Sequence, residues 1–202
     1  MAYRFDRDES VTRSVRRVAC DGLDDAIERL SACGGASADE IEDHVHEVRK
    51  RCKELRGLLR LVRSDLGDDF RSADRTIRTA ARELSALRDA HALLDTFDAL
   101  EQVAGTNGEL DGVRQAQASR SASASKSVSG GDPRLVHARL RLETVRRHVP
   151  EWKVTDGFAT VERGLERTYR DARDAMRAAR KRTTDEAMHE WRKHAKYQWY
   201  QV

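Results

Sequence analysis

One basic sequence pattern occurs twice in this chain, and the types and spacing of its residues suit them to bind a ligand. Each copy reads His-x-x-Arg-Lys-x-x-Lys, and the copies begin at His46 and His189. An α-helix turns by about 100° per residue, so the pattern gathers its cations on one face at intervals of about 5.4 Å. Guanidinium and ammonium groups at that spacing suit an anion with closely spaced phosphates.

The same residues argue against metal-dependent catalysis. His46-Glu47 and His189-Glu190 match the beginning of the zinc-protease motif His-Glu-x-x-His. A lysine holds the position of the second histidine in both copies, so no pair of metal ligands forms. The chain also contains no glycine-rich phosphate loop, no nucleophile elbow and no kinase signature. We therefore expect a protein that binds without catalysis, with no catalytic residue, no metal and no cofactor.

The first copy is predicted to lie on a helix with two different faces. Its basic face continues to Arg56 and Arg60, within an arc of roughly 120°. A second arc, well apart from the basic one, holds the apolar residues Ile41, Val45, Val48, Cys52, Leu55, Leu58, Leu59 and Val62. We expect the apolar face to pack in a core and the basic face to be exposed.

The second copy repeats this arrangement. Its basic residues fall together with Tyr200 close by, whereas Met188, Trp191 and Ala195 turn towards a core. The two helices are predicted to face each other across a basic groove. The residues predicted to line that groove are His46, Arg49, Lys50, Lys53, Arg56, Arg60, His189, Arg192, Lys193 and Lys196.

Other helices carry basic residues that could extend the groove. The candidates are the arginines Arg78, Arg82, Arg88, Arg170, Arg173 and Arg177, together with Tyr169 beside them. Basic residues three and four apart are more often a solvated face with ion pairs along the helix. Glu47, Glu54 and Glu190 are close enough in sequence to form such pairs. For the additional residues the solvated face is the preferred interpretation, and for the repeated motif it is not.

The paired motifs resemble those of the CHAD family, histidine-marked α-helical domains that bind inorganic polyphosphate. The resemblance covers nearly all of the chain and implies polyphosphate as the ligand. The first copy continues with Leu55-Arg56, as the family pattern does, whereas Gln198 and Trp199 replace that pair in the second copy. The family's domain extends further beyond its second motif, so the resemblance implies a C-terminally truncated domain.

Composition favours an all-α fold. Charged residues make up 36% of the chain and aromatic residues 5%, with 2 prolines and 12 glycines, which is typical of helical proteins. We predict an internal duplication with pseudo-twofold symmetry. Residues 1–104 would form a first helical bundle and residues 133–202 a second, incomplete one. Residues 105–132, rich in Ser, Ala and Gly, would be a flexible linker between them.

Local signals predict where the helices begin and end. Ser37 and Glu40 have the spacing of a capping box, and Gly67 should break the chain after the first motif helix. A long third helix is expected from Asp68 or Asp69 to about Leu100. Pro133 suits the first turn of the next helix. Further helices are expected after Gly157 and from about Asp185, and the latter carries the second motif.

The remaining sequence features limit the cellular setting. The net charge is only +3, so the local clustering of cations matters more than their total. The 3 cysteines show no close spacing, which suits a reducing compartment, and no apolar run is long enough to span a membrane. We expect a cytoplasmic protein, and the resemblance implies an association with polyphosphate granules.

Several alternatives remain open at this point. Binding of RNA or single-stranded nucleic acid would require stacking aromatics beside the cations, and Tyr197, Trp199 and Tyr200 are candidates, although such clusters are more often core. The chain could instead be an accessory domain that recruits a polyanion to a partner enzyme, or a purely structural bundle. An uncovered apolar face on the second bundle would favour a homodimer.

Overall fold

The computed structural model describes residues 4–85, 87, 112, 115–116 and 130–201. Within these residues the chain forms seven α-helices and two short 3-10 helices, and no strand. The predicted all-α fold class is confirmed. Among the described helices, none combines the length and apolarity that crossing a membrane requires.

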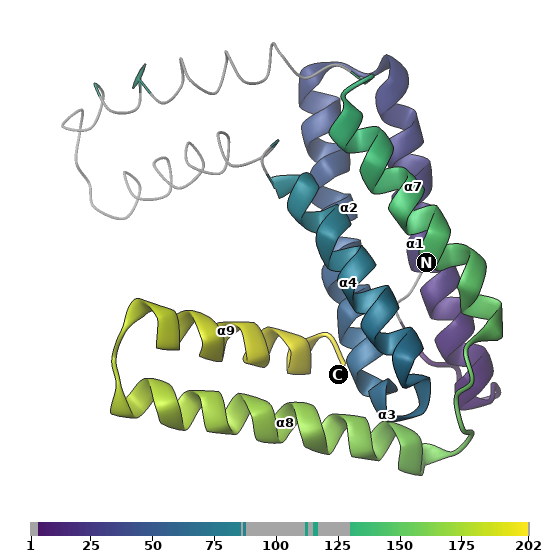
Figure 1. Ribbon diagram of the computed structural model, residues 1–202, viewed down its shortest axis with the longest axis vertical. Coiled ribbons are helices and arrows are strands. Elements are labelled where there is room, and N and C mark those ends of the chain that lie inside the picture. The colour runs from purple at the N-terminus through teal and green to yellow at the C-terminus, as the bar shows by residue number, and fades with distance from the viewer. Residues whose placement is uncertain (1–3, 86, 88–111, 113–114, 117–129, 202) are drawn as a thin grey trace.

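Four helices form an elongated bundle (Figure 1). They are α1 (Val11–Ala32), α2 (Ala38–Leu61), α4 (Asp68–Glu83) and α7 (Pro133–His148). Helix α1 packs on α2 and α7, and α4 packs on α2 and α7. This arrangement encloses one apolar core, because each helix contributes an apolar stripe to the interior.

The apolar arc predicted for α2 is buried in that core. Val48 and Cys52 have no exposed surface, and Leu58 and Leu59 are each 1% exposed. Burial raises the pKa of the Cys52 thiol to about 12, so this cysteine is a small core residue without thiolate character.

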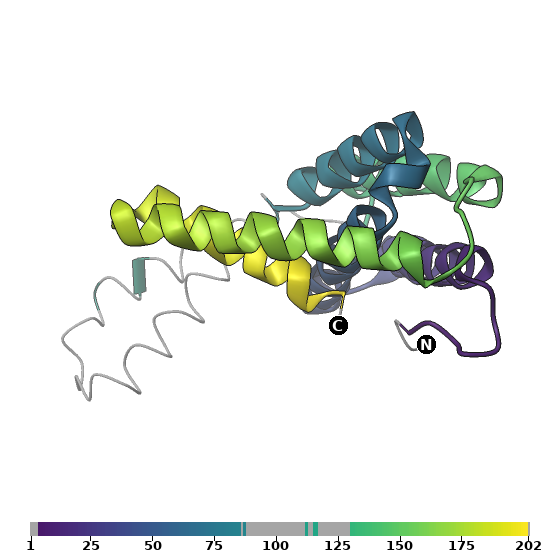
Figure 2. The ribbon, with the colours of Figure 1, turned by 90° about the horizontal axis from the view of Figure 1, so that it is seen from below.

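Two further helices form a hairpin that projects from the bundle (Figures 1 and 2). Helices α8 (Phe158–Lys181) and α9 (Asp185–Trp199) pack mainly on each other. The hairpin meets the bundle at α2 and at the short helix α3 (Arg63–Leu66). In Figure 1 it runs roughly across the bundle axis, so only one end of α9 reaches α2.

Helix ends follow the predicted local signals. The Ser37 hydroxyl accepts from the Glu40 backbone amide while the Glu40 carboxylate accepts from the Ser37 amide, which completes the capping box. Gly67 lies at φ 52°, a conformation that L residues rarely adopt, and separates α3 from α4. Pro133 begins α7, and Thr184 caps α9 by accepting from the Ala187 amide.

The predicted internal duplication is not confirmed. Helix α7, which opens the predicted second bundle, packs against α1 and α4. Helices α8 and α9 instead pair as a hairpin. The division at residues 104 and 133 remains a prediction, because most of the proposed linker and the end of the predicted long third helix lie outside the described residues.

Candidate functional site

The C-terminal end of α9 crosses the basic face of α2 and brings the two motif helices together. The Gln201 side-chain amide donates to the Gly57 carbonyl oxygen over 2.9 Å. Tyr197 is 8% exposed at this crossing, the most buried side chain of α9. The motif helices therefore meet end to side rather than lying face to face along their length.

Tyr197 lies against two arginines of the first motif helix. The Arg60 guanidinium carbon is 3.8 Å from the centroid of the Tyr197 ring, and that of Arg56 is 5.6 Å away. A cation over an aromatic face is attracted by the negative charge density of the ring. This contact fixes the position of both guanidinium groups relative to α9.

Asp74 of α4 binds the same two arginines. Its Oδ1 accepts from Arg56 Nε over 2.9 Å and from Arg60 Nη1 over 3.0 Å, and its side chain is 15% exposed. Burial by itself raises the pKa of this carboxyl. The hydrogen bond from Arg56 and the charge of Arg60 outweigh burial, and the pKa lies below its usual value. Asp74 is therefore ionised at neutral pH.

A cation-rich hollow of about 360 Å³ opens at this crossing, and we call it the basic hollow. It lies between the bundle and the hairpin. Six cationic side chains face two carboxylates in its lining, so the hollow carries a net positive charge. The lining residues are Arg56, Arg60, Arg63, Asp74, Arg78, Arg167, Thr168, Asp171, Lys193, His194 and Tyr197.

A second hollow, of about 540 Å³, combines cations with aromatic and apolar groups, and we call it the mixed hollow. It contains one lysine from each motif, Lys50 and Lys196, together with Phe5, Trp199 and Tyr200. The Lys196 ammonium lies 4.5 Å from the centroid of the Trp199 ring. The two lysines thus border a surface that is less polar than the basic hollow.

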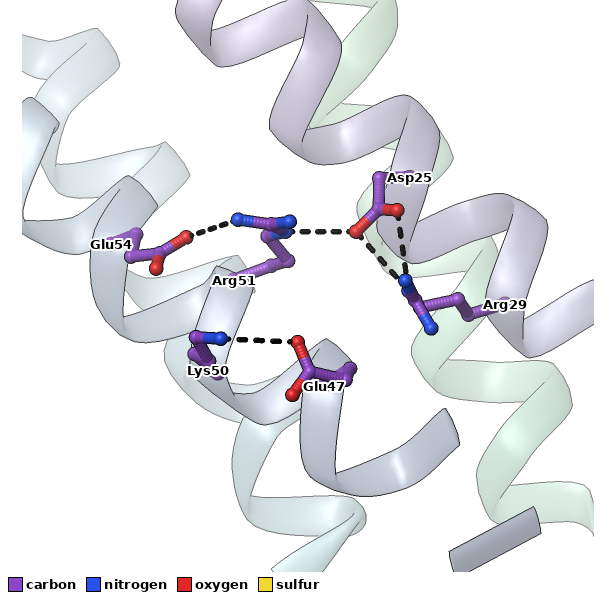
Figure 3. Close-up of polar contacts among 6 residues, drawn as sticks. All are labelled: Asp25, Arg29, Glu47, Lys50, Arg51 and Glu54. Carbon is purple, nitrogen blue, oxygen red and sulfur yellow. Dashed lines mark hydrogen bonds and ion pairs between the residues drawn. The ribbon is translucent and has the colours of Figure 1, made fainter. Parts of the chain in front are cut away.

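An equivalent lysine in each motif pairs with the glutamate three residues before it. Lys50 lies 3.3 Å from Glu47, as Figure 3 shows, and Lys193 binds Glu190 in the same way. Such exposed pairs are weak and screened by salt, so a polyanion can compete for the lysines. The expected pairing along the helix is therefore present within the motif itself.

A different ion-pair network fastens α2 to α1. Arg51 donates to Asp25 of α1 and to Glu54 of its own helix, both over 2.8 Å, and Asp25 also accepts from Arg29 (Figure 3). The hydrogen bond to Asp25 raises the pKa of Arg51. These contacts fasten α2 to α1 beside the first motif.

Arg49 is half-buried and joins α2 to α4. Its Nη1 donates to the Ala81 carbonyl oxygen over 3.2 Å and to the Ser85 hydroxyl. The sequence places Arg49 on the exposed basic arc, but its guanidinium reaches into the helix interface. Its neighbours His46 and Lys53 are exposed.

The structure brings together only some of the residues predicted to bind. Arg56, Arg60, Lys193 and the additional candidate Arg78 line the basic hollow. Exposed candidates that line neither hollow are His46, Lys53, Arg82, Tyr169, Arg170, Arg173, Arg177, His189 and Arg192. Arg88 lies outside the described residues.

Several residues of the basic hollow are absent from the sequence-based set. Arg63, the first residue of α3, follows Arg60 by three residues, so helical spacing in the sequence could have found it. Arg167 belongs to the regular arginine series of α8. His194, Thr168 and Asp74 carry no sequence signal, because long-range packing alone brings them to the hollow.

Close packing and one carboxylate fix the hairpin on the bundle. A Cβ on Gly164 of α8 would lie 1.8 Å from the Leu61 carbonyl oxygen, so only glycine permits this approach. The Asp65 carboxylate accepts from the Thr155 amide over 2.7 Å and lies 3.5 Å from Arg163. These contacts at the start of α8 orient the whole hairpin, including the second motif.

Comparison with known proteins identifies the family. The family model of the CHAD domain matches residues 10–202, which is nearly the whole chain. The chain therefore belongs to the CHAD family. No curated protein and no solved structure matches it. In the part of the chain that the structure describes, no group of three or more His, Cys, Asp or Glu side chains is arranged to hold a metal ion.

Proposed function

We propose that this chain binds inorganic polyphosphate in the basic hollow and along the adjoining basic face of α2. The observation that carries the proposal is the convergence of cations from both motif helices in one hollow. Arg56 and Arg60 come from the first motif helix and Lys193 from the second, with Arg78 and Arg167 on neighbouring helices. Membership of the CHAD family, which is associated with polyphosphate binding, supports the same ligand.

The chemistry of the lining suits a phosphate chain. Most of the cations in the basic hollow are arginines, which donate two parallel hydrogen bonds to phosphate oxygens and stay charged at physiological pH. Polyphosphate presents no base edges, so its binding is governed by charge density and counterion release. His46, His189, Arg192 and Lys53 would extend the contact along the two helices on either side of the crossing.

The proposed role is binding without catalysis. A phosphatase or a kinase would place a metal-binding carboxylate cluster or an activated nucleophile beside the anion. The carboxylates that line the basic hollow are Asp74 and Asp171, and Asp74 is engaged by two arginines. Delivery of polyphosphate to a partner enzyme, association with polyphosphate granules in the cytoplasm and homodimer formation through the hairpin are compatible extensions of this role.

Nucleic-acid binding is the second candidate, and the mixed hollow favours it. Trp199 is 63% exposed and lies beside Lys196, and Lys50 borders the same surface. Exposed aromatics next to cations are the arrangement on which bases stack. Polyphosphate would use the basic hollow and RNA the mixed hollow, so variants at each surface separate the two functions.

The deciding experiment is a titration of the chain with long-chain polyphosphate and with single-stranded RNA of matched charge. At about 0.15 M salt, where weak surface charge contacts are screened, we expect tight binding of polyphosphate and weak binding of RNA. Equal binding of the two polyanions would reduce the site to a generic basic surface. Binding of neither would contradict the proposal.

A matched pair of charge-reversal variants locates the site. Arg78→Glu with Lys193→Glu changes the basic hollow. Arg13→Glu with Arg147→Glu makes the same change in charge at exposed residues of α1 and α7 that line neither hollow. The first pair should weaken polyphosphate binding at least ~10-fold and reduce the slope of log Kd against log salt by about 1.4, from two lost phosphate contacts. The control pair should change the polyphosphate affinity and the salt dependence far less.

A further inference from the structure

A carboxylate stands among the cations of the basic hollow, and its position conflicts with simple anion binding. Asp74 is one of two acidic residues in a lining with six cationic side chains. Its Oδ1 occupies the point between Arg56 and Arg60 where an anionic ligand would bind both guanidinium groups. We propose that Asp74 is an internal competitor for the phosphate ligand and sets the minimum chain length that the site accepts, an inference that rests on the proposed function.

The geometry makes the competition direct. One carboxylate oxygen accepts from Arg56 Nε and from Arg60 Nη1, at 2.9 and 3.0 Å, the distances that a phosphate oxygen would take with these donors. The far side of Arg60 is covered by the Tyr197 ring, 3.8 Å from the guanidinium carbon. A ligand therefore approaches the pair from the hollow, where Asp74 already lies.

Asp74 keeps its charge at neutral pH. The hydrogen bond from Arg56 and the charge of Arg60 outweigh the effect of burial, and the pKa of Asp74 lies below its usual range. The Asp74 side chain therefore remains a negatively charged carboxylate at neutral pH. A ligand must displace it or accept its repulsion.

Displacement is costly for a short anion and tolerable for a long one. Asp74 is part of the chain, so it competes at a high effective concentration, whereas a short anion gains contacts only inside the basic hollow. A long polyphosphate reaches the same arginines while it also binds cations outside the hollow, along α2 and α9. Its additional contacts offset the loss of the Asp74 pair, and a short oligophosphate lacks them.

The opposite role is also physically reasonable and gives opposite results. Asp74 could hold Arg56 and Arg60 in the orientation that phosphate requires, as a positioning residue. Neutralising a positioning residue weakens binding of every phosphate ligand. Neutralising a competitor strengthens binding, most of all for short ligands.

The test compares Asp74→Asn with the unaltered chain. Asparagine keeps the shape of aspartate and one acceptor oxygen for Arg56 but removes the charge. The control is Asp171→Asn, which removes the same charge from the lining of the same hollow, at an exposed residue of α8 for which the described residues show no ion pair. Each protein is titrated with tripolyphosphate and with long-chain polyphosphate, and its helix content and melting temperature are recorded.

We expect Asp74→Asn to raise tripolyphosphate affinity by roughly 10-fold and long-chain affinity by less than about 3-fold, because the long ligand depends less on the hollow. Asp171→Asn should raise both by less than about 2-fold, as a screened charge would. Asp74→Ser, which is smaller and also neutral, gives the same comparison if Asp74→Asn loses its helix content.

Each outcome separates this inference from the proposed function. If the unaltered chain binds long-chain polyphosphate but Asp74→Asn weakens both ligands, Asp74 is a positioning residue and the inference fails alone. The inference also fails if Asp74→Asn raises the affinity for both ligands equally, or if Asp171→Asn changes the affinities as much as Asp74→Asn does. If the unaltered chain does not bind long-chain polyphosphate, the proposed function fails and this inference fails with it.

Discussion

The guanidinium carbon of Arg60 lies 3.8 Å from the centroid of the Tyr197 ring. Arg60 extends the first basic motif and Tyr197 follows the second, 137 positions later by residue number. This contact joins the two motif helices, and the basic hollow opens beside it. Tyr197 is an internal packing residue, so its ring is engaged by arginine and is not offered to a nucleobase.

Removing the Tyr197 ring should loosen the crossing of α9 over α2. Tyr197→Ala eliminates a buried aromatic ring and its contact with two arginines, and we expect a loss of about 2–4 kcal/mol in the free energy of unfolding. Tyr197→Phe keeps the ring and should retain most of that stability. Urea unfolding followed by circular dichroism measures both, and equal stability of the two variants would exclude the stacking role.

Gly164 should tolerate no side chain. A Cβ there would lie 1.8 Å from the Leu61 carbonyl oxygen, so Gly164→Ala must push α8 away from α2 at a cost of about 1–3 kcal/mol or more. The matched control is Gly34→Ala, because nothing lies within 4 Å of a Cβ at Gly34. Thermal unfolding of the two variants makes the comparison. If the Gly164→Ala protein is as stable as the control, α8 does not pack against α2 as closely as in the structure.

Stability should fall in acid as Asp65 loses its charge. Burial raises the pKa of Asp65, but the hydrogen bond from the Thr155 amide and the charge of Arg163 outweigh it, and the pKa lies below its usual value. A lowered folded-state pKa contributes stability that is complete above about pH 4 and is lost as the pH falls through the folded-state pKa.

Asp65→Asn tests this contribution. Its unfolding free energy should lie about 1–3 kcal/mol below that of the unaltered chain at pH 7, and the difference should shrink below about pH 4. Denaturant unfolding at a series of pH values from 7 to about 3 measures it. A difference that is independent of pH would assign the effect to shape and not to charge.

Two neighbouring cations of the first motif should separate stability from binding. Arg49 donates to Ala81 and Ser85 of the α4 side, so Arg49→Glu should cost about 1–3 kcal/mol by removing both hydrogen bonds and placing a negative charge between the helices. Lys53 is exposed, so Lys53→Glu should lower the melting temperature far less than Arg49→Glu does and should weaken polyphosphate binding. Melting curves and polyphosphate titrations on both variants are required, and a Lys53→Glu protein destabilised as much as Arg49→Glu would contradict this division.

The sequence by itself determined the local structure. Helix formation, helix ends and the apolar face depend on spacing and on capping residues close in sequence, so the capping box at Ser37, the break at Gly67 and the burial of Val48 and Cys52 are all as predicted. The repeated His-x-x-Arg-Lys-x-x-Lys pattern was sufficient to indicate the CHAD family.

Only the tertiary structure decided which cations meet. Helical periodicity fixes a residue's face on its own helix but not the angle at which two helices cross. The crossing at Gly164 and Tyr197 brings Arg56, Arg60 and Lys193 to one hollow and leaves His189 outside it. Asp74, from a third helix, binds the same arginines. Its separation from them in sequence is 14 to 18 residues, so no local sequence pattern predicts the contact.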